Sequence, residues 1–190
     1  MIISIDIILE VAATVLNLIF LFFIIKEKKI GWIYGVLASA LSIYLFYRIR
    51  LYAEAILYVY YVVIGAYGYY TWSSAAGQIP LNISTWNLNR HALVVLVGIV
   101  FAMVLGFILD EYTDATNAYL DAVTTVFSFL ATFMEARKIL SVWFFWIAIN
   151  SLTIGLYLNK GLEIYAGLTV IYLAASFVGY NTWKKKMVNN

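Results

Sequence analysis

The segment VWFFWIAINSLTIGLYL, residues 142–158, indicates what kind of protein this chain is. It is mostly apolar, and its length is close to the ~20 residues that a helix needs to cross the hydrocarbon of a bilayer. Its polar and aromatic side chains step by three and four residues, which places them on one face of a helix. They are Trp143, Trp146, Asn150, Thr153 and Tyr157.

That face predicts either a binding site or a packing surface. An amide in a lipid-buried helix is costly unless it finds a partner. Two indoles beside such an amide suit a planar heteroaromatic ligand, including a cationic one. The alternative is that Trp143 and Trp146 anchor the helix at the membrane interface while Asn150 bonds to a neighbouring helix. Both interpretations stay open on this segment alone.

The composition extends the membrane assignment to the whole chain. Of the 190 residues, 65% are hydrophobic and 12% are charged, whereas soluble domains are about half apolar and a quarter charged. Helices are the default element for spanning a bilayer. We therefore expect an all-α integral membrane protein, with the lipid bilayer as a partner and no nucleic acid bound.

The residue types argue against catalysis. There are no cysteines, which excludes disulfides and thiolate metal sites. The single histidine, His91, lies beside Arg90 and is expected to be an interface residue rather than a ligand or a base. A membrane enzyme would need a nucleophile–base pair or a metal cluster. We therefore expect no catalytic residue, no metal and no cofactor, and the absence of a lysine in the last apolar segment argues against a retinal photoreceptor.

Seven apolar segments predict seven transmembrane helices. Most of the turns between them are short, including EARK at 135–138, whereas the loop at 73–90 is long. The segments are 5–25, 30–47, 52–72, 91–109, 118–134, 140–158 and 162–183.

The lysine and arginine residues predict the orientation in the membrane. The loops after the first, third and fifth segments, together with the C-terminus, carry nine of them, whereas the other side carries three. Cytoplasmic loops are enriched in these residues. We therefore expect the N-terminus outside and the C-terminus in the cytoplasm, where the lysines at 184–186 would bind anionic lipid head groups.

The chain also contains an internal repeat. Shifted by 111 residues, Trp32 falls on Trp143, and the GYYTW at 68–72 falls on the GYNTW at 179–183. The repeat unit is three helices, with a less patterned linker helix between the two copies. Because the linker adds one crossing, the two triplets run parallel, as in some known transporters. The predicted boundaries are 1–72 for the first repeat, 73–117 for the loop, linker helix and outer loop, 118–183 for the second repeat and 184–190 for a cytoplasmic basic tail.

The two repeats differ on the face described above. Trp146 falls on Gly35, and Asn150 falls on Ser39. We interpret this difference as one half presenting a ring and an amide while the other makes room for a ligand held where the halves meet. The alternative is ordinary divergence of a packing face, on which small residues let helices approach closely.

The repeat supplies four further candidate residues. It pairs Tyr61 with Tyr172, whose hydroxyls are expected to point inward toward a substrate. It also places Glu10 and Asp121 at matching positions near the outer ends of two helices. These carboxylates either have a structural role or attract a cationic substrate to the entrance. Because such carboxylates lie near helix ends, coupling to an ion gradient is not expected.

Several of these motifs resemble the PnuC family of bacterial vitamin transporters. The most specific is the Trp-x2-Trp-x3-Asn segment at 143–150. The others are LYAE at 51–54, YGYYTW at 67–72 and Asp121 at the start of the fifth helix. The resemblance covers nearly the whole chain, including the arrangement of three, one and three helices.

The resemblance implies a transporter rather than an enzyme. It implies facilitated diffusion of an unphosphorylated B vitamin, chiefly nicotinamide riboside, with thiamine or riboflavin as alternatives and a cytoplasmic kinase that traps the substrate. It also implies a SWEET-like fold, a homotrimer and a location in the bacterial inner membrane.

The resemblance further implies which residues contact the substrate. Trp143, Trp146 and Asn150 would lie at it. Tyr157 and Asn181 lie one position away from the tyrosine and asparagine of riboside carriers, which leaves the particular vitamin open. An accessory or structural membrane protein without transport is the alternative from another class.

Overall fold

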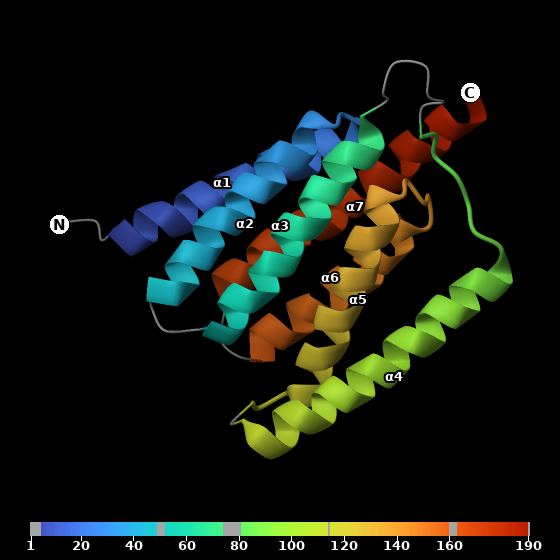
Figure 1. Cartoon of the computed structure of the whole chain (residues 1–190). Coiled ribbons are helices and arrows are strands. Elements are labelled where there is room, and N and C mark those ends of the chain that lie inside the picture. Colours follow the sequence, from blue (N-terminus) through green and yellow to red (C-terminus); the bar gives the residue numbers. More distant parts are fainter. Residues whose placement is uncertain (1–4, 49–51, 74–80, 114, 160–162, 190) are drawn as a thin grey trace. The chain divides into compact units, whose positions relative to one another are not determined.

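The computed structural model describes residues 5–48, 52–73, 81–113, 115–159 and 163–189. Within these residues the chain forms seven α-helices, with short turns between α1 and α2 and between α5 and α6 and a short extended segment before α4 (Figure 1). The all-helical prediction is therefore confirmed for the described part of the chain. The helices are α1 Ile5–Ile25, α2 Ile30–Arg48, α3 Tyr52–Trp72, α4 Leu88–Tyr112, α5 Ala118–Ala136, α6 Val142–Asn159 and α7 Glu163–Asn189.

Four of these helices, α1, α2, α4 and α6, are long and apolar enough to cross a membrane by length and composition. The boundaries differ from the sequence prediction mainly at α4 and α7. Helix α4 begins at Leu88 because the Asn87 side chain accepts a hydrogen bond of 3.0 Å from the Arg90 N–H and caps the first turn. Helix α7 continues through the lysines at 184–186, so this basic segment is helical rather than a separate tail. Lysine is a good helix former, and its charge is favourable near a helix C-terminus.

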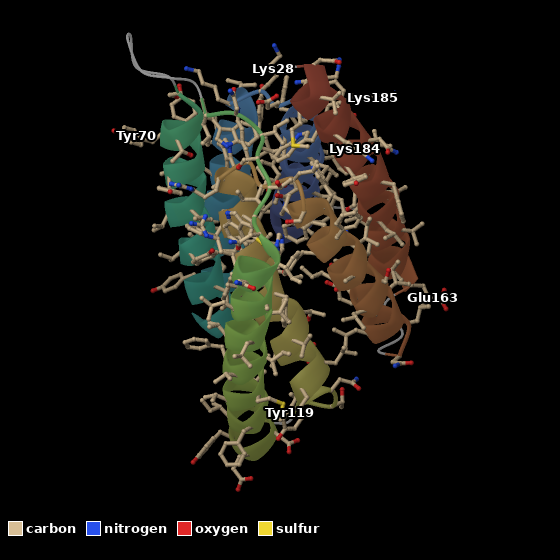
Figure 2. All side chains as sticks on the ribbon, turned by 90° about the vertical axis from the view of Figure 1, so that its right-hand side faces the viewer. Lys28, Tyr70, Tyr119, Glu163, Lys184 and Lys185 are labelled. Atoms are coloured by element: carbon tan, nitrogen blue, oxygen red, sulfur yellow. The ribbon has the colours of Figure 1, made fainter. Side chains whose placement is uncertain are left out.

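The chain divides into two compact units, Met1–Leu81 and Asn82–Asn190. In the first unit, α2 packs against both α1 and α3. In the second unit, α4 packs on α5, α5 on α6 and α6 on α7. Figure 2 labels Glu163 at one end of α7 and Lys184 and Lys185 at the other, so the two ends of this helix carry opposite charge.

The turn between α5 and α6 is held by the extended segment that precedes α4. The Ser84 N–H donates to the Lys138 carbonyl at 3.0 Å, and the Leu140 N–H donates to the Ser84 carbonyl at 2.8 Å. The His91 Nε2 lies 2.6 Å from the Ser141 hydroxyl oxygen. These contacts fix where α6 starts and give the single histidine a structural partner.

The turns α1–α2 and α5–α6 have the same hydrogen bonds at positions 111 residues apart. Glu27 and Lys138 both have positive φ, 60° and 52°. In each turn this residue's N–H bonds to the carbonyl three residues earlier, at 2.8 Å for Glu27 and at 2.9 Å for Lys138. A non-glycine residue with positive φ is uncommon, so two such turns joining equivalent helices are a specific shared feature.

Each unit contains a tryptophan seated on a glycine of the following helix. Trp32 of α2 lies over Gly68 of α3, and Trp143 of α6 lies over Gly179 of α7. Both indoles are buried, and each also packs edge-on against a second tryptophan, with centroid distances of 5.6 Å and 5.3 Å. A Cβ added to either glycine would lie 2.4 Å from the ring. The helices can therefore approach this closely only because these positions are glycine.

We expect Gly179→Ala to lower the stability of the folded protein by about 1–3 kcal/mol, because overpacking forces side chains or backbone to shift. The measurement is the thermal unfolding midpoint of the purified protein in detergent. Gly167→Ala in the same helix is the matched control, since nothing lies within 4 Å of a Cβ there. It should leave the midpoint unchanged or raise it slightly. Equal midpoints for the parent and the Gly179 variant would contradict the packing argument.

Candidate binding site

The candidate site begins in the second turn of α6, where Trp146 faces α5. The Trp146 side chain is half-buried. Its indole N–H donates a hydrogen bond to the carboxylate of Glu135, in the last turn of α5. This bond sets the direction of the indole N–H, because the ring has a single N–H donor.

Glu135 is a functional candidate that the sequence analysis missed. The sequence pattern placed it in a turn at 135–138, whereas the structure places it inside α5, with 2% of its surface exposed. Its Oε2 atom has no hydrogen-bond partner among the described residues. The repeat offered one signal for this residue, since the shift of 111 aligns Glu135 with Ile24, an apolar residue, and so suggests a buried position.

Asn150 lies one turn farther along α6 and is buried, at 8% exposed. Its Nδ2 donates to the Ser176 hydroxyl oxygen of α7 at 3.3 Å. The Ser176 hydroxyl in turn donates to the Tyr172 carbonyl at 2.8 Å. Because the serine proton is already used, the serine can only accept from Asn150, which fixes the orientation of the amide. Within the described residues, the Asn150 carbonyl oxygen is therefore left as an acceptor.

Trp143 lies differently from Trp146. Its indole is fully buried between Gly179 and Trp183 of α7. Its Nε1 has no hydrogen-bond partner among the described residues. The two indoles therefore contact different helices, because Trp143 packs toward α7 while Trp146 bonds toward α5.

The remaining candidates of the second unit lie along the same three helices. Tyr157, near the end of α6, is half-buried, with its ring 5.9 Å from that of Tyr165. Asp121, in the first turn of α5, interacts electrostatically with Tyr157. A carboxylate in the first turn also favours the helix dipole. Tyr172 is half-buried and contributes its carbonyl to the Ser176 bond.

Two of the predicted residues belong to the first unit. Tyr61 of α3 is half-buried between the rings of Tyr58 and Tyr60, at centroid distances of 5.8 Å and 5.6 Å. Glu10 lies on an exposed face of α1. Within the described residues, no three His, Asp or Glu side chains are grouped so that they could hold a metal ion.

Comparison with known proteins identifies the family. The profile of a family described as nicotinamide mononucleotide transporter matches residues 7–185. The chain belongs to this family. It is a family of membrane transporters that includes the PnuC proteins, so the family expected from the sequence motifs is confirmed.

Individual relatives agree with this assignment. The chain is 22% identical to the nicotinamide riboside transporter PnuC of Escherichia coli, over 91% of this chain and 82% of that protein. It is 28% identical to the nicotinamide riboside transporter PnuC of Neisseria mucosa, over 91% of this chain and 70% of that protein. It also resembles the crystal structure of the vitamin B3 transporter PnuC, with a TM-score of 0.75 and 25% identity over 95% of this chain and 82% of that one.

We expect Ser176→Ala to destabilise the second unit by about 1–2 kcal/mol, because the buried Asn150 amide loses its acceptor. Chemical or thermal unfolding in detergent measures the effect. Ser151→Ala is the control, since that exposed hydroxyl bonds only to the Ile147 carbonyl of its own helix. If the two variants were equally stable, the Asn150–Ser176 bond would not hold α6 against α7.

Proposed function

We propose that this chain is a carrier that moves an unphosphorylated B vitamin, nicotinamide riboside, across the bacterial cytoplasmic membrane by facilitated diffusion. One observation carries the proposal. The oriented indole of Trp146 and the available carbonyl oxygen of Asn150 lie one turn apart on the same helix. The ring and the acceptor can therefore act on one ligand.

The chemistry of nicotinamide riboside fits these two groups. Its pyridinium ring is planar and cationic, and an indole face attracts such a ring both by stacking and by a cation–π interaction. Its carboxamide carries two N–H groups that can donate a hydrogen bond to the Asn150 carbonyl oxygen. Trp143 would act indirectly, by fixing the rotation of α6 through its packing on Gly179. Tyr157, Tyr172 and Tyr61 remain proposed lining residues, and Asp121 and Glu10 remain proposed entrance or structural residues.

The names of the relatives favour the riboside over its phosphate as the substrate. The Escherichia coli and Neisseria mucosa proteins are both named for the riboside, although the family description names the mononucleotide. Transport of the riboside would also allow the cell to accumulate the vitamin without an ion gradient. A cytoplasmic kinase would add a phosphate, and the added negative charge would prevent return through an apolar membrane.

The architecture that we propose is seven crossings in two parallel three-helix repeats joined by α4, in a SWEET-like arrangement. The identical turns at Glu27 and Lys138 and the two tryptophan–glycine contacts support the duplication. The distribution of lysine and arginine supports an outer N-terminus and a cytoplasmic C-terminus. From the resemblance to the PnuC family, we also propose that the protein assembles as a homotrimer.

The same experiments test two alternatives, another vitamin as the substrate and an accessory protein without transport. Thiamine is also flat and cationic, so the same face could serve it, and riboflavin is a neutral planar vitamin. An accessory membrane protein would bind none of these compounds.

Calorimetric titration of the purified protein should show tightest binding of nicotinamide riboside, weaker binding of thiamine and weakest binding of riboflavin. Trp146→Ala should weaken riboside binding by about tenfold or more, since stacking on an aromatic ring contributes about 1–3 kcal/mol. Trp86→Ala, which changes a half-buried tryptophan beside His91, is the control and should bind like the parent. Unchanged affinity in the folded Trp146 variant would rule out the stacking role.

Uptake into proteoliposomes should proceed without any proton or sodium gradient and should stop when the inner and outer concentrations are equal. Enclosing a riboside kinase with ATP should raise the total accumulated vitamin above the outer concentration. A strict requirement for an ion gradient would overturn facilitated diffusion.

A further inference from the structure

Glu135 is a buried acidic residue whose role the proposed site does not explain. Its carboxylate is almost completely buried, and Oε2 has no hydrogen-bond partner among the described residues. A buried carboxylate without compensation is strongly unfavourable. Such a group is retained in a membrane helix mainly where it serves a function.

The described surroundings of Glu135 provide one neutral donor. That donor is the Trp146 indole N–H. The Lys138 N–H donates to the Glu135 backbone carbonyl at 2.9 Å, which leaves the carboxylate itself out of that bond. Burial with this one neutral donor disfavours the ionised carboxylate, and a cation bound beside Oε2 would stabilise the charged form.

The first unit shows that the turn itself does not require this carboxylate. Its equivalent turn has Ile24 in place of Glu135 and Gly35 in place of Trp146. There the space beside Gly35 is taken by Phe20, whose ring lies 2.9 Å from a Cβ built on the glycine. In the second unit the position of Phe20 is taken by Ala131, which leaves room for an indole. The same helix–turn–helix geometry thus forms with apolar residues, and the Glu135–Trp146 pair is an addition to it.

We propose that Glu135 is a specificity-determining residue that selects a substrate with a positively charged ring. One carboxylate oxygen holds the Trp146 indole in place, and the unpartnered oxygen supplies the counter-charge for the cation stacked on that indole. A hydrogen bond from the indole N–H to an anion also polarises the ring and strengthens its attraction for a cation. This inference rests on the proposed function, because it assumes that the ligand binds at Trp146.

The test compares two ligands of nearly the same shape. Nicotinamide riboside has a cationic ring, and its reduced form, dihydronicotinamide riboside, has a neutral one. Calorimetry measures both with the full-length parent in detergent. We expect the parent to bind the cationic form at least about tenfold more tightly than the reduced form. A contact to a charged group contributes about 1.5–3 kcal/mol, and about 1.4 kcal/mol corresponds to a tenfold change in affinity.

Glu135→Gln removes the charge but keeps an oxygen that can accept from Trp146. It should weaken binding of the cationic form by about tenfold or more and change binding of the reduced form by no more than about twofold. Glu163→Gln is the matched control, because this carboxylate lies exposed at the start of α7 (Figure 2), and it should bind both forms like the parent.

Each other outcome contradicts a stated claim. If Glu135→Gln weakens both forms equally, Glu135 only supports the fold and the inference is overturned. If the folded parent binds neither form, the proposed function fails and the inference fails with it. If Glu135→Gln does not fold, the parent alone is tested with 1-methylnicotinamide, a cation, against neutral nicotinamide. Equal affinity for these two compounds would overturn the selection of a charged ring.

Discussion

The packing of a tryptophan on a glycine of the next helix is the contact on which each unit depends. In a bilayer the lipid tails are as apolar as the helices, so close packing and polar contacts must hold helices together. Trp143 on Gly179 provides such packing in the second unit. It also fixes the rotation of α6, which directs Trp146 toward Glu135 of α5 and Asn150 toward Ser176 of α7. The directions in which Trp146 and Asn150 leave α6 therefore depend on this contact.

The polar groups then form two arrangements around residues one turn apart on α6, one toward α7 and one toward α5. Toward α7, a chain of hydrogen bonds runs from Asn150 through Ser176 to the Tyr172 carbonyl and leaves one acceptor open. Toward α5, the carboxylate of Glu135 holds the indole of Trp146 and leaves one oxygen open. Unmet hydrogen-bonding groups are expensive in a buried place. A ligand that carries both a hydrogen-bond donor and a positive charge would satisfy both groups, as the proposed function requires.

The arrangement of the candidate site residues was only partly predictable, and the reason is geometric. The spacing of Trp143, Trp146 and Asn150 correctly indicated a shared helical face. However, residues three or four positions apart can still meet different neighbours, and here Trp143 packs against α7 while Trp146 bonds to α5. Glu135 was assigned to a turn because helix ends are uncertain by one or two residues when only local pattern is available. Its burial comes from the partners around it rather than from its own position in the chain.

Hydropathy, the step of three and four residues and the family motifs were enough to establish an all-helical membrane transporter of the PnuC family, because these properties are local and additive along the chain. They also located the tryptophan–asparagine segment. The sequence could not show that the two tryptophans make different contacts, that Glu135 is buried, or in which direction the Asn150 amide points. These depend on which side chain of a neighbouring helix lies opposite, and that is set by the packing of glycines against indoles between segments tens of residues apart.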